Sequence, residues 1–314
     1  MQEAKEFPKM REIYGSLVFD QKAMKQRLPR DVYENLVGAI EGRQKLDSGI
    51  ADTVALAMKD WAVSKGASHW AHWFHPLTEL TAEKHTAFVT ADENGFPLES
   101  FRGEDLMQSE PDASSFPSGG TRSTFEARGY SAWDPTSPAF IIKSPKGGTL
   151  CIPSVFLAYD GTPLDLKTYL LRSMEAVESR ALKMLKLFGN RGVRYVRATV
   201  GGEQEFFLLD RPRAQKRTDI RFCGRTLLGS PPPRDQKMED HYFGSIPTRV
   251  LAYMEDVQRD LARLGVDLAT RHNEVARCQF EFAPNFTEAN LSCDQNQLIM
   301  ETMRKMARQH DKLV

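Results

Sequence analysis

The chain has 314 residues, 41% hydrophobic and 27% charged, which allows about two folded domains. Basic and acidic residues both number 42, so no net charge favours binding to nucleic acid or to an anionic membrane. Residues 1–6 lack the apolar stretch of a secretory signal, and no apolar run is long enough to span a bilayer. The four cysteines form no Cys-x-x-Cys pair, so we expect reduced thiols in a cytoplasmic protein.

Hydrophobic periodicity predicts a mixture of helices and strands. Residues 1–30 are polar and are expected to form an arm or an irregular packing segment. Apolar residues recur at helical spacing in residues 29–45, 50–65, 170–188, 247–264 and 287–309. Apolar or β-branched runs predict strands at residues 85–90, 139–143, 150–159, 193–200, 206–209 and 266–270. The arginine-rich residues 211–225 are expected to form a solvated loop, with contact to a phosphate as the alternative.

Four of the seven histidines lie close together in the sequence, at His69, His72, His75 and His85. Such a group suggests a metal site. The aromatic neighbours and the break at Pro76 instead favour a packed, hydrogen-bonded segment, and this is the interpretation we adopt.

Residues 112–120, DASSFPSGG, are small and polar. Loops of this composition often carry function, and a plain surface loop is the alternative. A phosphate-binding interpretation of residues 118–120 is weak, because the sequence has neither the lysine of a P-loop nor a clear strand–loop–helix pattern there.

A Glu-x-Glu pair, Glu203 and Glu205, stands at the start of the apolar residues 206–209. In a strand, residues two apart point to the same face. Two carboxylates held close together raise each other's pKa, and a hard divalent cation such as Mg²⁺ or Mn²⁺ would stabilise them. On this pair alone, two solvated glutamates at an exposed strand end remain the preferred interpretation.

Two further glutamates, Glu274 and Glu281, are seven residues apart. An odd spacing cannot place both side chains on one face of a single straight strand. A turn or bulge between them could bring them together.

Several stretches, in this order along the chain, together resemble type III glutamine synthetase. The resemblance extends over nearly the whole chain from about residue 50 onward, and as a set these motifs are very specific. They are residues 70–78 (WAHWFHPLT), 125–130 (FEARGY), 133–138 (WDPTSP), 202–208 (GEQEFFL), 238–244 (MEDHYFG), 271–276 (RHNEVA) and 294–298 (DQNQL).

The resemblance implies a reaction. ATP phosphorylates the γ-carboxylate of glutamate, and ammonia then displaces phosphate from γ-glutamyl phosphate to give glutamine. Two divalent metal ions per complete site, Mg²⁺ or Mn²⁺, stabilise the transferring phosphoryl group. The resemblance also implies a homo-oligomeric ring, a hexamer or dodecamer, with active sites between subunits.

The resemblance assigns roles to particular residues. Glu205, Glu274 and Glu281 match the ligands of one metal ion, and Glu203 matches a ligand of the other. In the loop at residues 112–115, Asp112 matches the aspartate that helps to bind and deprotonate ammonium, and Ser115 is expected to bind substrate. Arg277 stands where a proline is expected, which puts the local turn in question.

The fold that we expect is α+β. A β-grasp-like N-terminal domain with added helices would occupy residues 1–147, and the first part of an antiparallel-sheet catalytic domain would occupy residues 148–314. The sequence stops before the family's remaining catalytic motifs, so we expect a glutamate–ammonia ligase chain that is inactive alone. The alternative is a non-catalytic truncated paralogue that acts as an assembly or regulatory partner of a full-length synthetase.

Overall fold

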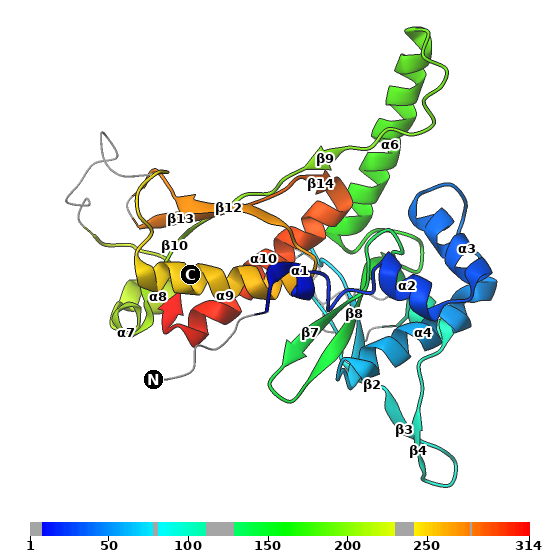
Figure 1. Ribbon diagram of the computed structural model, residues 1–314, viewed down its shortest axis with the longest axis horizontal. Coiled ribbons are helices and arrows are strands. Elements are labelled where there is room, and N and C mark those ends of the chain that lie inside the picture. Colours follow the sequence, from blue (N-terminus) through cyan, green and yellow to red (C-terminus); the bar gives the residue numbers. More distant parts are fainter. Residues whose placement is uncertain (1–7, 78–80, 111–128, 230–241, 277) are drawn as a thin grey trace. The chain divides into compact units, whose positions relative to one another are not determined.

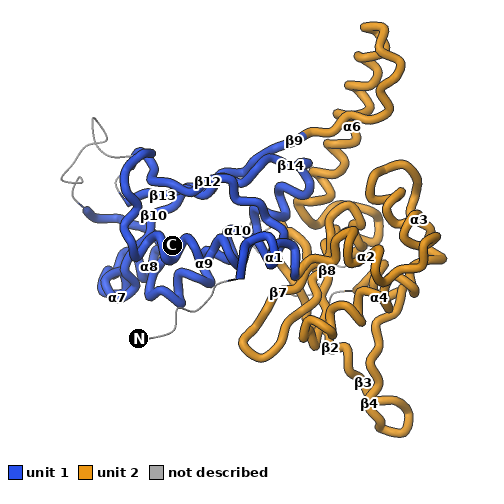
Figure 2. Tube along the Cα trace, viewed as in Figure 1, with its two compact units in different colours: residues 1–16, 199–314 blue, residues 17–198 orange. Residues whose placement is uncertain are grey.

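The structure is a computed structural model that describes residues 8–77, 81–110, 129–229, 242–276 and 278–314. The chain divides into two compact units, shown in different colours in Figure 2. One unit comprises residues 17–198, and the other comprises residues 199–314 together with residues 1–16. Each unit has its own buried hydrophobic cluster.

The unit of residues 17–198 is built on a six-stranded sheet with the order β2-β1-β8-β6-β5 and with β7 also paired to β8. β1 and β8 are parallel, and the sheet's other described pairings are antiparallel. A separate hairpin joins β3 to β4. The strands are β1 (His69–Trp73), β2 (Thr86–Ala87), β3 (Val89–Ala91), β4 (Pro97–Glu99), β5 (Gln108–Ser109), β6 (Gly129–Trp133), β7 (Phe140–Ser144) and β8 (Gly147–Ala158).

Helices complete the core of this unit. Val54, Met58 and Trp61 recur at helical spacing, and they belong to the same buried cluster as Leu150 and Ile152 of β8. A mixed sheet with a parallel central pair, packed against a helix, is the β-grasp-like arrangement that we expected. The helices are α2 (Gln21–Arg27), α3 (Arg30–Ile40), the 3₁₀ turn Ser48–Ile50, α4 (Ala51–Ser64), α5 (Gly103–Met107) and α6 (Leu166–Leu187) (Figure 1).

The unit of residues 199–314 and 1–16 centres on the antiparallel sheet β10-β13-β12. α9 and α10 pack on this sheet, and Phe206, Tyr253, Phe282 and Met303 share one buried cluster (Figure 1). The strands are β9 (Thr199–Val200), β10 (Gln204–Phe207), β11 (Leu209–Asp210), β12 (Leu268–Asn273), β13 (Gln279–Pro284), β14 (Thr287–Glu288) and β15 (Lys312–Leu313). The helices are α1 (Met10–Ile13), α7 (Arg211–Ala214), α8 (Thr218–Cys223), α9 (Thr248–Arg263) and α10 (Ala289–Gln309).

Mixed helix and sheet in both units confirms the α+β class. The expected domain boundary between residues 147 and 148 falls at the start of β8, in the interior of the first sheet, whereas the compact units divide between residues 198 and 199. A compact unit need not fold on its own, so the domain boundary stays a prediction.

Two of the expected strands were wrong. Residues 206–209 do not form one buried strand: Phe206 is buried, but Phe207 and Leu209 are exposed, because successive side chains of a strand point to opposite faces. Residues 193–200 form a strand only at Thr199–Val200, where β9 finds its partner in β14. Within the part of the chain that the structure describes, no helix is long and apolar enough to cross a membrane.

Candidate metal centre

The register of the β10-β13-β12 sheet places acidic residues side by side. Glu205 of β10 lies directly opposite Glu281 of β13, and His272 of β12 lies opposite Glu281 from the other side. Directly opposed residues of neighbouring strands point to the same face of the sheet. Glu205, Glu281 and His272 therefore form a row across the three strands.

Glu274 joins this row from the turn that links β12 to β13. Its backbone N–H donates to the carbonyl of Gln279 at 2.9 Å, which closes the turn. Its Oε2 accepts the N–H of Val275 at 2.9 Å, while its Oε1 is buried and accepts no hydrogen bond from any described residue. The turn thus allows both members of the odd-spaced pair, Glu274 and Glu281, to reach one place.

The structure has one group of metal-ligating side chains among the described residues. Ligand atoms of His272, Glu274 and Glu281 all lie within 4.8 Å of one another. Glu274 and Glu281 are each only 4% exposed. A buried cluster of this kind fits a hard divalent cation, since carboxylate oxygens are the ligands that such ions prefer.

The buried carboxylates of Glu274 and Glu281 shift each other's pKa, and a cation would relieve the repulsion between their negative charges. Burial, together with hydrogen bonding to Glu274 and the negative charges of Glu203, Glu274 and Glu205, raises the pKa of Glu281 to about 8. Hydrogen bonding with Glu281 lowers the pKa of Glu274. A metal ion bound between the two carboxylates would supply the positive charge that this site lacks.

His272 is a candidate ligand to which our sequence analysis gave no role. Its Nδ1 lies 2.9 Å from the carbonyl of Asn273, an acceptor, so Nδ1 donates this hydrogen bond and Nε2 faces Glu281. Nε2 lies 3.8 Å from Oε2 of Glu281. The sequence did contain a signal for this ligand, because His272 precedes Glu274 by two residues, the spacing that places two strand residues on one face.

Glu205 and Glu203 lie at the exposed edge of the cluster. Glu205 shares the sheet face with Glu281, and its Oε2 accepts a hydrogen bond from Nε2 of Gln279 at 2.8 Å. Glu203 comes just before β10, and its charge acts on Glu281. Tyr242 also lies beside the cluster. Its ring centroid lies 5.1 Å from that of His272, and the charge of Glu274 raises the pKa of its hydroxyl.

Three residues from the sequence analysis have no described position. Asp112, Ser115 and Arg277 lie outside the described residues. Of the histidine-rich segment, His72 is buried, and its ring nitrogens lie 2.8 Å from Oγ of Ser131 and 3.0 Å from the carbonyl of Asp105.

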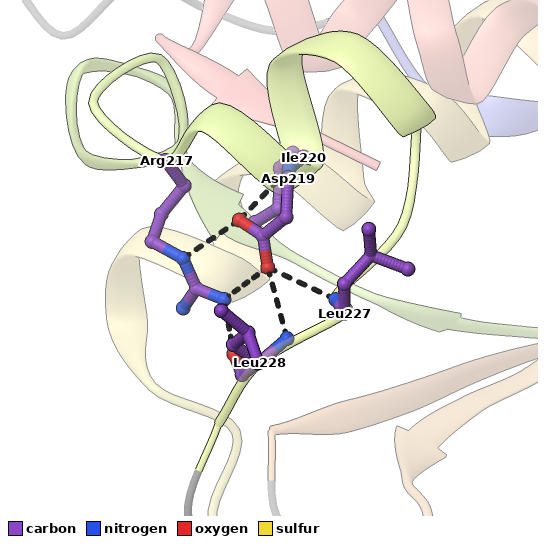
Figure 3. Close-up of polar contacts among 5 residues, drawn as sticks. All are labelled: Arg217, Asp219, Ile220, Leu227 and Leu228. Atoms are coloured by element: carbon purple, nitrogen blue, oxygen red, sulfur yellow. Dashed lines mark hydrogen bonds and ion pairs between the residues drawn. The ribbon is translucent and has the colours of Figure 1, made fainter.

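The arginine-rich segment is more ordered than a solvated loop. It contains α7 and α8, and the carboxylate of Asp219 holds the segment together through hydrogen bonds (Figure 3). The carboxylate of Asp219 pairs with Arg217 and accepts backbone N–H groups of Ile220, Leu227 and Leu228. The hydrogen bond from Arg217 is the main cause that lowers the pKa of Asp219. Arg217 is therefore used internally, which weakens the phosphate-contact alternative at this residue.

Comparison with known proteins decides the family. Residues 10–173 match the family described as "Glutamine synthetase type III N terminal", and this match covers more than half of the chain. The protein belongs to the type III glutamine synthetases. Residues 178–314 match the family described as "Glutamine synthetase, catalytic domain".

The glutamine synthetases that resemble this type III chain are longer. The chain is 47% identical over 302 residues to a glutamine synthetase of Bacteroides fragilis (strain YCH46). It is 45% identical over 307 residues to a type-3 glutamine synthetase of Dictyostelium discoideum. Each match covers 96% of this chain and 41% of the relative, so the chain spans about two fifths of the length of these relatives.

The fold of this type III synthetase chain also resembles a solved structure. The glutamine synthetase of Plasmodium falciparum matches with a TM-score of 0.56 and 13% sequence identity, over 85% of this chain and 49% of that one. At this identity the likeness shows the fold alone.

Proposed function

We propose that this chain takes part in the ATP-dependent ligation of ammonia to glutamate, through γ-glutamyl phosphate. The observation that carries the proposal is the buried pair Glu274 and Glu281, with Glu205 opposite Glu281 on the same sheet face. Burying carboxylates is unfavourable unless a cation or a proton compensates them. The unpartnered Oε1 of Glu274 and the raised pKa of Glu281 support a cation-binding role for this cluster.

The residues fit Mg²⁺ or Mn²⁺. Glu205, Glu274 and Glu281 would hold one ion, with Nε2 of His272 as a further donor, and Glu203 would contribute to a second ion. When bound, the ions offset the negative charge of a transferring phosphoryl group. The protein's own side chains hold the carboxylate oxygens of these glutamates in one place before the substrates bind.

Other elements of the proposal rest on family membership. Asp112 would help to bind and deprotonate ammonium, and Ser115 would bind substrate. The chain would assemble into a homo-oligomeric ring, a hexamer or dodecamer, with active sites shared between subunits. A cytoplasmic location is supported by the absence of any disulfide among the four described cysteines, Cys151, Cys223, Cys278 and Cys293.

Glutamine formation by a full-length type III synthetase that carries these residues tests the proposal. The segment homologous to this chain in the Bacteroides fragilis relative would be replaced by this sequence, with and without Glu281→Gln. We expect Glu281→Gln to lower turnover by more than about 100-fold, because even partners that only support a metal ligand typically contribute 10- to 100-fold. Glu34→Gln is the control, since Glu34 is exposed and forms a surface ion pair with Arg30 one helical turn away.

Full turnover by the Glu281→Gln protein would contradict the proposal. An equal loss in the Glu34→Gln protein would show that the effect of the substitution is not specific to the cluster. Binding of Mn²⁺ to each variant, measured without substrates, separates loss of the ion from loss of a later step.

A further inference from the structure

We infer that Gln279 is the positioning residue that holds Glu205 in the orientation needed to bind the metal ion. This inference rests on the proposed metal site. Gln279 contacts a carboxylate of the site without belonging to the proposed ligand set.

Gln279 connects two parts of the cluster. Its backbone carbonyl accepts the N–H of Glu274 at 2.9 Å, and its backbone N–H donates to the carbonyl of Ala276 at 3.1 Å. Its side-chain Oε1 accepts the N–H of Ala276 at 3.3 Å. Its Nε2 donates to Oε2 of Glu205 at 2.8 Å. One residue therefore closes the turn that carries Glu274 and also reaches across the sheet to Glu205.

The turn fixes which way the Gln279 amide points. The N–H of Ala276 can only donate, so the amide oxygen of Gln279 must face it. The amide N–H₂ group is then directed at Glu205, where it can only donate. The carboxylate oxygen that it meets is Oε2, which leaves Oε1 of Glu205 for another partner.

Glu205 needs such support more than the other two glutamates do. Glu274 and Glu281 are buried, so the surrounding side chains restrict their rotamers. Glu205 is exposed, so packing does not restrict its rotamers. Ordering a free Glu side chain costs conformational entropy, and the hydrogen bond from Gln279 removes part of this cost before the ion binds.

The register explains why position 279 can do this. Glu281 lies directly opposite Glu205, and Gln279 is two residues before Glu281, so it occupies the same face of β13 on the diagonal from Glu205. Gln204 offers a matched comparison. It is also a glutamine of this sheet with a hydrogen-bonded amide. Its Nε2 donates to Oδ1 of Asn296 at 2.8 Å and to the backbone carbonyl of Glu203 at 3.3 Å, and not to a carboxylate of the cluster.

The test is a titration of the purified chain with Mn²⁺, with free Mn²⁺ measured by electron paramagnetic resonance. Gln279→Met keeps the length of the side chain and removes both hydrogen bonds. We expect it to weaken Mn²⁺ binding by about 10-fold, the lower end of what supporting partners of metal ligands contribute. Gln204→Met should bind Mn²⁺ as the unmodified chain does.

Two further readouts separate positioning from general structural support. If Gln279 acts through Glu205, Gln279→Met should have no further effect in a Glu205→Gln background. Water-proton relaxation should also show about one more water on the bound Mn²⁺ in Gln279→Met, because the lost carboxylate oxygen is replaced by solvent. Melting of the metal-free protein should be similar for Gln279→Met and Gln204→Met.

Each outcome decides the matter. Unchanged or tighter Mn²⁺ binding by Gln279→Met overturns the inference, as does an equal loss in the Glu205→Gln background. If Glu205→Gln alone leaves Mn²⁺ binding unchanged, the proposed ligand role of Glu205 fails, and the role of Gln279 fails with it. If Gln279→Met does not fold, Gln279→Asn takes its place, since its amide is one methylene too short to reach both partners.

Discussion

His72 is a buried histidine whose charge state depends on the fold. Burial lowers its pKa to about 4, from an ordinary value near 6.5, despite its hydrogen bond to the carbonyl of Asp105. Between these two values the unfolded chain binds a proton at this residue and the folded chain does not. The contribution of His72 to the free energy of unfolding therefore falls as the pH falls from about 6.5 to about 4.

Replacing His72 by Gln should flatten this pH dependence. The expected difference between the two proteins, accumulated from pH 6.5 down to pH 4, is on the order of 3 kcal/mol. Urea unfolding followed by tryptophan fluorescence measures it, since Trp61, Trp70, Trp73 and Trp133, the chain's four tryptophans, all lie in the unit of residues 17–198. Equal slopes for His72→Gln and the unmodified chain would show that His72 does not titrate in this way.

At the level of residues, only part of the candidate site could be predicted from the sequence. The resemblance named Glu205, Glu274 and Glu281, and the structure brings them to one sheet face and one turn. The role of Gln279 depends on a diagonal across two strands far apart in the sequence, so no local pattern shows it. Whether these residues bind a metal ion stays a prediction.

Among the elements, the long helices followed from periodicity and the short strands did not. α4 and α9 lie almost where their apolar stripes predicted, because a 14- or 16-residue amphipathic helix repeats its signal several times. α2 lies inside a segment that we expected to be irregular. β9 and β14 have two residues each, too few to establish a period of two.

The pairing of β6 with β8 depends on Gly129. A Cβ atom at this position would lie 2.0 Å from the carbonyl oxygen of Leu157, so the two strands could not keep their present distance. Gly129→Ala should therefore lower the free energy of unfolding by about 1–3 kcal/mol, as overpacking does.

Gly147→Ala is the matched control, because Gly147 is in β8 of the same sheet. A Cβ atom there would have its nearest neighbour, Oγ of Ser68, at 3.5 Å, an ordinary contact. We expect a change within about 0.5 kcal/mol. Tryptophan fluorescence in urea reports on both variants, and equal effects would contradict the close approach at Gly129.

At the scale of the whole molecule, the division into units could not be predicted. Residues 1–16 belong with residues 199–314, because the hydroxyl of Tyr14 donates to the carbonyl of Gly265 and the N–H of Gly15 donates to that of Ala262. Contacts across about 250 residues leave no trace in composition or periodicity. The α+β class was predictable, because the family motifs fixed it.

Sharing of active sites between subunits makes a prediction at the same scale. In a full-length context, Asp112→Ala chains and Glu205→Gln chains should each be inactive. If the two residues serve one site from neighbouring subunits, mixed rings should regain up to about one quarter of full glutamine formation, because random mixing leaves that share of sites intact. Mixed rings with no activity would show that both residues serve the site of their own subunit.

The most direct test of the central claim is a crystal structure of the chain with Mn²⁺, in which anomalous scattering locates the ion. We expect one strong anomalous peak among Glu205, Glu274 and Glu281, with metal–oxygen distances of roughly 2.1–2.2 Å. The amide of Gln279 should still donate to Oε2 of Glu205. A peak elsewhere, or no peak at this cluster when Mn²⁺ is in excess, would contradict the assignment of these glutamates as a metal site.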